Sequence, residues 1–272
     1  VYVAYPKRLL ATFGSFTSTG IAMAFNAVLS SLLWTGSQAL SPAGAHTVSP
    51  LPALDAFGVL VLIAHSLILE VRIAGQCGVS MPFQFFLRLF SGIFAAFLLH
   101  RLLDSLGLFQ EKATILLAAE ATASWDDWCL QQIKTLAQMY VIICAVMLLQ
   151  KFLDAFRISD WMARLLGPVL RLLGISPKAV SIIIIGFTMG LLYGSGILIK
   201  SAQEGSLTPR DALCSISLLG LAHSLIEDTI LLALLGGSLW GLLGFRLVFT
   251  LAAGALINFF YPALARFAVA RP

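Results

Sequence analysis

The sequence predicts an all-α membrane protein, a polytopic transmembrane helical bundle of about seven spans with two internal repeats. Three observations carry this prediction. Charged residues make up only 11% of the 272 residues, against roughly 25% in soluble domains. Apolar stretches close to the length of about 20 residues that crosses a bilayer recur along the chain. One pentapeptide occurs twice, at residues 64–68 and 222–226.

Seven apolar stretches give the predicted spans. They lie at residues 9–40, 53–74, 83–106, 133–149, 179–199, 212–235 and 239–264. Prolines and glycines mark the connections, with Pro42 and Pro50 after the first span and a tight turn at residues 75–82 after the second. Thr208 and Pro209 predict an N-cap and first helical position at the start of the sixth span.

The longest polar interruption divides the chain into three parts. Residues 108–129 contain Glu111, Glu120, Asp126 and Asp127, which predicts a water-exposed acidic loop. We therefore expect a first membrane repeat at residues 1–107 and a second at residues 130–272.

Residues 158–176 predict a different kind of helix. Arg164 and Arg171 lie two turns apart among apolar residues, a pattern too short and too charged for a span. It is typical of an amphipathic helix that lies in the membrane interface. Gly167 and Pro168 predict a break within this helix.

Basic residues set the predicted orientation. Five of them cluster between the fourth and fifth spans, namely Lys151, Arg157, Arg164, Arg171 and Lys178. Because Lys and Arg are enriched on the cytoplasmic side, we expect the N-terminus inside and the C-terminus outside, in the inner membrane of a bacterium.

The repeated pentapeptide predicts an internal duplication. The sequence AHSLI places His65 and Ser66 opposite His223 and Ser224, at an offset of 158 residues. The same offset, without a gap, aligns an acid with an acid and an arginine with an arginine further along. With seven spans, the repeated segments are an even number of spans apart, which predicts parallel repeats. Such repeats recur in transporters, with the substrate held at the repeat interface.

Ionisable residues inside spans are costly and usually face a bundle interior or a polar cavity. The predicted path residues are His65, Ser66, Glu70, Arg88, His223, Ser224, Glu227, Asp228 and Arg246. One interpretation is structural: Glu70 pairs with Arg88, and Asp228 pairs with Arg246. The other is functional: both halves face each other and these groups line a path for a small polar solute or ion.

A metal site is an open alternative within the functional interpretation. His223 and Glu227 are four residues apart and would share a helical face. Together with His65 they form a candidate set for a divalent transition metal, although a proton relay would use the same groups. Apart from this ion, the sequence indicates no cofactor.

Small residues form a series through the fifth span, namely Gly186, Gly190, Gly194, Ser195 and Gly196. Two explanations are open: close helix packing, or a broken gating helix whose free backbone groups bind a solute. A phosphate-binding loop is disfavoured because the GxxxxGK[ST] order is missing.

The run GFTMGLLYGSGILIKSAQEGSLTPRDALCSISLLGLAHSLIEDT at residues 186–229 resembles the nucleoside recognition domain, also called the Gate domain. It is similar to stand-alone spore maturation A/B type proteins and to Gate segments of the ferrous-iron transporter B family and of concentrative nucleoside transporters. The resemblance covers about residues 176–258, and residues 52–99 only through the repeat. It implies a transporter-like helical core with two Gate-type halves.

We therefore expect a membrane transporter or channel for a small polar solute or ion, with a non-transporting scaffold or subunit as the alternative. Motifs of hydrolases and metalloproteases, such as GxSxG and HExxH, do not occur, and we expect no enzymatic activity. The expected partners are membrane lipid, the solute, and a second copy or another Gate-type subunit. The net charge of +4 is explained by topology rather than by nucleic acid.

Overall fold

The structure is a computed structural model that describes residues 51–109, 124–234 and 236–269. The predicted first span, most of the loop after it, and Glu111 and Glu120 of the acidic loop lie outside the described residues. Within these ranges the regular structure is helical, and strand pairing is limited to one isolated bridge between Val79 and Val269. The predicted all-α class is confirmed for this part of the chain.

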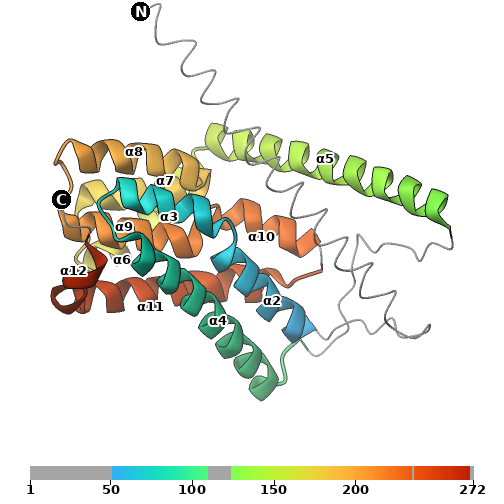
Figure 1. Ribbon diagram of the computed structural model, residues 1–272, viewed down its shortest axis with the longest axis horizontal. Helices are drawn as coiled ribbons and strands as arrows, with labels where there is room; N and C mark the ends of the chain where they lie inside the picture. Colours follow the sequence, from blue (N-terminus) through green and yellow to red (C-terminus); the bar gives the residue numbers. More distant parts are fainter. Residues whose placement is uncertain (1–50, 110–123, 235, 270–272) are drawn as a thin grey trace, which may run out of the picture. The chain divides into compact units, whose positions relative to one another are not determined.

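Figure 1 shows the helices in chain order. They are α2 (Leu51–Ala64), α3 (Leu67–Gln76), α4 (Met81–Leu106), α5 (Trp125–Ala155), α6 (Ile158–Leu172), α7 (Pro177–Met189), α8 (Leu191–Gln203), α9 (Pro209–Ala222), α10 (Leu225–Leu234), the π-helix η1 (Trp240–Phe245), α11 (Arg246–Phe259) and α12 (Tyr261–Ala268). Because α5 begins at Trp125, Asp126 and Asp127 of the predicted acidic loop are helical.

The chain divides into two compact units. Of the described residues, 124–147 belong to the first unit, and 51–109 with 148–269 (apart from residue 235) belong to the second. The second unit contains all the described helices except the first part of α5, and it contains the candidate site.

Five helical stretches of the described residues are long and apolar enough to cross a membrane. They are Leu54–Gln76, Met81–Leu106, Trp125–Leu153, Pro209–Ala233 and Trp240–Phe259, and each overlaps one predicted span. The membrane character of the chain is therefore supported.

The predicted span at residues 179–199 is not continuous. It consists of α7 and α8, which have 13 residues each. A helix of this length is about 20 Å long, whereas the hydrocarbon core of a bilayer is about 30 Å thick. The chain reverses at Gly190, and α7 and α8 lie side by side (Figure 1). A Cβ added at Gly194 would lie 2.8 Å from the Cα of Gly186, so the absence of side chains allows this close approach.

Helix α9 is the central helix of the second unit. Every residue from Asp211 to Ala222 is buried, as expected for a helix that is covered on all sides. Its N-terminus has the predicted cap, because the Thr208 hydroxyl accepts from the Asp211 backbone N–H at 3.1 Å and Pro209 follows. One apolar core joins α9 to α6 and α7, and a smaller one joins residues of α2 and α4 to Leu221 and Leu242.

Helix α6 is amphipathic, as predicted. Its buried side chains include Met162, Leu166 and Leu170, which share an apolar core with α7. The predicted break near Gly167 and Pro168 is wrong, because α6 runs through both residues. Proline removes only one hydrogen bond of the helix, and the packing against α7 covers this part of α6. Its location in the membrane interface stays a prediction.

The prediction of parallel repeats is wrong, because the α2–α3 segment and the α9–α10 segment run antiparallel (Figure 1). Asp55 at the start of α2 accepts a 2.7 Å hydrogen bond from the backbone of Ser238, which follows α10. Gln84 lies in the first turn of α4, close to the end of α3, and donates to the carbonyl of Ile216 within α9. The prediction counted residues 179–199 as one span between the two segments. The α7–α8 hairpin instead returns to the side from which it starts, so there is one crossing fewer and the second segment runs in the opposite direction.

Candidate functional site at two broken helices

Two of the five candidate spans are broken in the middle, at the repeated His-Ser pair. Helix α2 ends at Ala64 and α3 begins at Leu67; α9 ends at Ala222 and α10 begins at Leu225. At each break a serine has left-handed backbone geometry, with φ 55° at Ser66 and 46° at Ser224. Such values are uncommon for residues other than glycine. The breaks free backbone carbonyls at the C-terminal ends of α2 and α9.

Two buried arginines bind these freed carbonyls in the same way. Arg88 from α4 donates through Nε to Ile63 O and through Nη2 to His65 O, both at 3.0 Å. Arg246 from α11 donates to Leu221 O at 2.9 Å and to His223 O at 3.1 Å. Both side chains are 0% exposed. Backbone groups inside a bilayer must find their hydrogen-bond partners within the protein. The two guanidinium groups supply these partners and so stabilise the broken helices.

Arg246 also joins the two halves. Its Nη2 donates to the carbonyl of Leu62 in α2 at 3.2 Å, in addition to the two carbonyls of its own half. The two breaks are therefore fixed relative to each other by a buried side chain.

The two acids differ in their pairing. Glu70 forms a buried ion pair with Arg88, as the structural interpretation expects. The corresponding pair of Asp228 and Arg246 is not among the ion pairs of the described residues. Asp228 Oδ2 lies instead 3.9 Å from His65 Nε2, and Arg246 Nη1 is buried without a hydrogen-bond partner among the described side chains and backbone. Because aspartate is one methylene shorter than glutamate, it does not span the same gap.

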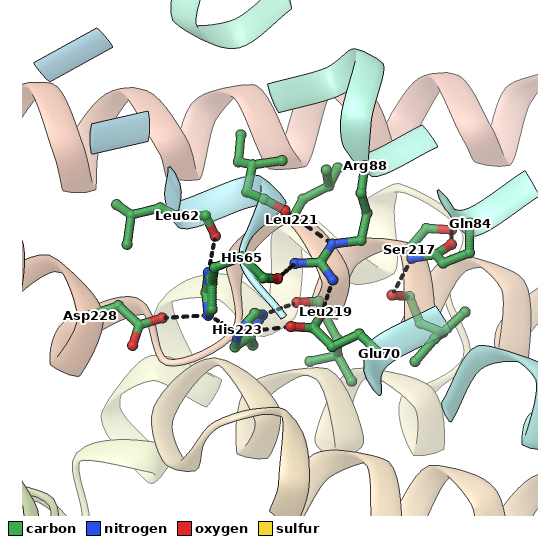
Figure 2. A network of polar contacts seen from close by, with 12 residues as sticks. Leu62, His65, Glu70, Gln84, Arg88, Ser217, Leu219, Leu221, His223 and Asp228 are labelled. Carbon is green, nitrogen blue, oxygen red and sulfur yellow. Dashed lines mark hydrogen bonds and ion pairs between the residues drawn. The ribbon is translucent and has the colours of Figure 1, made fainter. Parts of the chain in front are cut away.

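The two histidines meet between the breaks (Figure 2). Their Nε2 atoms are 3.2 Å apart. Each Nδ1 faces backbone carbonyls of the preceding helical turn, Val61 O and Leu62 O for His65 and Leu219 O for His223. The acids approach crosswise, since Glu70 Oε1 lies 3.5 Å from His223 Nε2 and Asp228 approaches His65. The sequence predicted that these groups would come together, and the structure brings His65, Glu70, Arg88, His223 and Asp228 into one cluster.

Glu227 lies outside this cluster. The group of potential metal ligands consists of His65, Glu70 and His223, with their ligand atoms within 4.8 Å of one another. The premise that His223 and Glu227 share a helical face fails because the helix breaks between them, at Ser224. Glu70 comes instead from α3 of the opposite half, which sequence spacing alone does not reveal.

The tip of the α7–α8 hairpin lies against the second break. The Ser224 N–H donates to Gly186 O at 3.2 Å. Gly190 has φ 86°, and a Cβ there would lie 2.7 Å from Ser224 Oγ. Of the predicted gating residues, Gly186, Gly190 and Gly194 make these close approaches, Ser195 is buried, and Gly196 faces open space.

Two buried polar residues of the second unit were not predicted. Asp55 is fully buried and accepts hydrogen bonds from the backbone and hydroxyl of Ser238. Gln84 bridges α4 to α9 through Ile216 O and the hydroxyl of Ser217. An acid within an apolar span is a functional or structural signal, so Asp55 could have been found; Gln84 carries no such signal.

Comparison with known proteins finds two similarities. Residues 136–239 match the family model of the Gate domain, described as nucleoside recognition. This range includes α6 to α10, and with them the hairpin and the second break. This match confirms the resemblance to Gate domains that the sequence indicated for part of the chain, and the apolar helices support an integral membrane protein.

One similar protein is the uncharacterized membrane protein YvoD of Bacillus subtilis (strain 168). It is 27% identical over 199 residues, which are 69% of this chain and 62% of that protein. The match thus spans less than two thirds of this relative's length. No solved structure matches the chain.

Proposed function

We propose that this protein is a transporter or channel for a small polar solute or ion, with its path at the contact between two Gate-type halves. One observation carries the proposal: two broken spans meet at their breaks, and a hairpin too short to cross the membrane ends at the same point. Broken helices and hairpins of this kind expose backbone groups at membrane depth, where they can bind a solute. A purely structural bundle has no need of them.

The proposal includes an internal duplication of inverted topology. At the offset of 158 residues, both helix breaks, both left-handed serines and both arginine–carbonyl contacts correspond. Opposite orientation of the two segments relates them by an axis in the membrane plane. This relation is the one found in many secondary transporters, and it allows each half to open toward a different side.

The residues of the cluster then have different roles. Arg88 and Arg246 maintain the breaks, because the Nε and Nη2 groups of both donate to carbonyl oxygens at the breaks. The imidazoles of His65 and His223 and the carboxylates of Glu70 and Asp228 face one another and bind the solute or ion. His65 is the accessible member, with 23% of its side chain exposed.

Transport can be measured without knowing the substrate. Proteoliposomes containing the purified chain are incubated with a defined mixture of nucleosides, amino acids, sugars and inorganic salts, and their contents are analysed by mass spectrometry. We expect at least one component to accumulate, and its uptake to fall at least tenfold in His223→Ala. His100→Ala is the matched control, since His100 is an exposed histidine of α4.

Unchanged uptake in His223→Ala would contradict the site, and no uptake of any component would contradict transport by this chain alone. The latter result favours the alternative, a non-transporting scaffold or subunit that acts with a second copy or another Gate-type protein. The exposed aromatic side chains of α4, such as Phe86, Phe90 and Phe97, suit contact with lipid or with such a partner. In either case we propose a non-enzymatic role in the inner membrane.

A further inference from the structure

Three atoms that accept hydrogen bonds converge in the cluster without a donor between them. They are Nε2 of His65, Nε2 of His223 and Oε1 of Glu70. The two nitrogens are 3.2 Å apart, and the oxygen lies 3.5 Å from His223 Nε2. All the candidate ligand atoms lie within 4.8 Å of one another, and Asp228 Oδ2 approaches the same point at 3.9 Å from His65 Nε2.

The backbone determines the tautomer of both histidines. A carbonyl oxygen only accepts hydrogen bonds, so each Nδ1 that faces one carries the proton. This holds for His65, whose Nδ1 is 3.1 Å from two carbonyls, and for His223, whose Nδ1 is 2.9 Å from Leu219 O. In the neutral ring the other nitrogen then has a free lone pair. Two nitrogens that each carry a lone pair therefore lie 3.2 Å apart, and a carboxylate oxygen adds a third acceptor.

Lone pairs at this distance repel each other unless a cation lies between them. A proton would join only one pair of these atoms, whereas a metal ion joins all of them. We propose that His65, His223 and Glu70 bind one divalent transition-metal ion, with Asp228 beside the open coordination position. This site belongs to the proposed path but does not require that the protein transports the ion or any other solute.

The distances agree with a metal of this class. In tetrahedral zinc sites the metal–nitrogen distance is about 2.0–2.1 Å, which places two ligand nitrogens about 3.3 Å apart. A carboxylate oxygen at about 2.0–2.2 Å from the metal lies at a similar distance from a ligand nitrogen. The observed separations of 3.2 and 3.5 Å match both values. The two imidazoles favour a transition metal over magnesium or calcium, which prefer sites made of oxygen ligands alone.

The surroundings of the ligands resemble those of known metal sites. Metal-binding histidines commonly donate their second ring N–H to a backbone carbonyl, and ligating carboxylates are hydrogen-bonded in turn. Both histidines have such carbonyl partners. Arg88 pairs with Glu70 and so orients its carboxylate. These contacts fix the ligands before an ion arrives.

The experiment measures Zn²⁺ binding to the full chain in detergent, by calorimetry and by elemental analysis after dialysis. We expect one Zn²⁺ per chain, not displaced by excess Mg²⁺. His65→Gln, His223→Gln and Glu70→Gln should each weaken binding by roughly 100-fold or more, beyond the effect of losing an outer-shell contact. His100→Gln and Glu204→Gln, at exposed positions, are the matched controls and should bind like the wild type.

X-ray absorption on the wild-type zinc complex needs no variant and covers the case in which a variant does not fold. We expect two imidazole nitrogens at about 2.0–2.1 Å. Three results would overturn the site. Zinc could be bound without imidazole, or the His65→Gln/His223→Gln double variant could bind zinc as well as the wild type. The third result is that no zinc binds and ¹⁵N NMR shows a proton shared between the two rings. Zinc binding without solute uptake would uphold the site and contradict transport; uptake without zinc binding would do the reverse.

Discussion

At the residue scale, the arginines explain how a broken helix persists in an apolar environment. A buried carbonyl without a donor costs about 1–3 kcal/mol, and each break exposes several. Arg88 and Arg246 provide planar sets of donors that remain charged. The same guanidinium of Arg88 also neutralises Glu70, so its two tasks are linked.

Arg88→Met is expected to destabilise the protein strongly, because it leaves two carbonyls without donors and the Glu70 carboxylate buried and unpaired. Breaking a buried pair in this way costs about 3–5 kcal/mol. The double variant Arg88→Met/Glu70→Gln should recover part of this loss, since the unpaired charge is gone. Thermal unfolding in detergent measures both effects, with Arg164→Met on the exposed face of α6 as control. Equal stability of the single and double variants would contradict the role of the ion pair.

At the element scale, the α7–α8 hairpin determines where the site can form. Its tip reaches the break between α9 and α10 because glycines allow backbones to approach closely. At Gly190 the left-handed backbone and the neighbouring Ser224 hydroxyl both exclude a side chain. At Gly196, in the same hairpin, a Cβ would meet nothing within 4 Å.

These two glycines make a matched test of the hairpin tip. Gly190→Ala should destabilise the protein by roughly 1–3 kcal/mol, because alanine is strained at this φ and its Cβ meets Ser224. Gly196→Ala lies within α8 and should stabilise it by about 0.5–1 kcal/mol, since glycine is costly in a helix. Unfolding in detergent compares the two. If both substitutions have the same effect, the hairpin does not turn at Gly190 as described.

At the scale of the whole second unit, the hairpin changes the predicted topology. Four parts of the second unit lie on one side of it: the turn after α3, the end of α8, the start of α9, and α12. Ser80 N in that turn donates to Ala268 O of α12, and Arg210 of α9 donates to Asn258 near the end of α11. This side carries Lys178 at the start of α7, Lys200 in the last turn of α8, Arg210 at the start of α9 and Arg266 in α12, whereas Arg101 is near the opposite end of α4. The bias of Lys and Arg predicts that this side is cytoplasmic. With the hairpin, we therefore predict α12 on the inside, whereas the count of seven spans predicted the C-terminus outside.

Labelling with a membrane-impermeant maleimide in intact cells tests this orientation. In a chain without its native cysteines, Ser105→Cys should be labelled from outside, and Ser206→Cys and Arg266→Cys only after permeabilisation. The native cysteines are removed mainly because of Cys129, which is exposed. Burial raises the pKa of the Cys77 thiol to about 12, so Cys77 would react little near neutral pH. Labelling of Ser206→Cys and Arg266→Cys on opposite sides would contradict the hairpin.

Several features follow from local sequence alone. The apolar spans can be predicted from composition, because a charged side chain is costly in lipid wherever it lies within a span. The amphipathic pattern of α6 and the cap at Thr208 depend on residues within one or two turns. The Gate resemblance depends on a contiguous run, and the pairing of Glu70 with Arg88 on a short helical connection.

The tertiary structure alone decided the relation of the two halves and the membership of the cluster. The relative direction of the two segments depends on whether the glycine-rich stretch between them crosses the membrane or turns back. The close approach of Gly186 and Gly194, eight residues apart, shows that it turns back. Glu70, rather than Glu227, joins the histidines because the backbone turns at Ser224 and the opposite half supplies the acid. The His–His contact joins residues that are 158 positions apart. Hydropathy and spacing describe single helices, whereas this contact depends on how two of them cross.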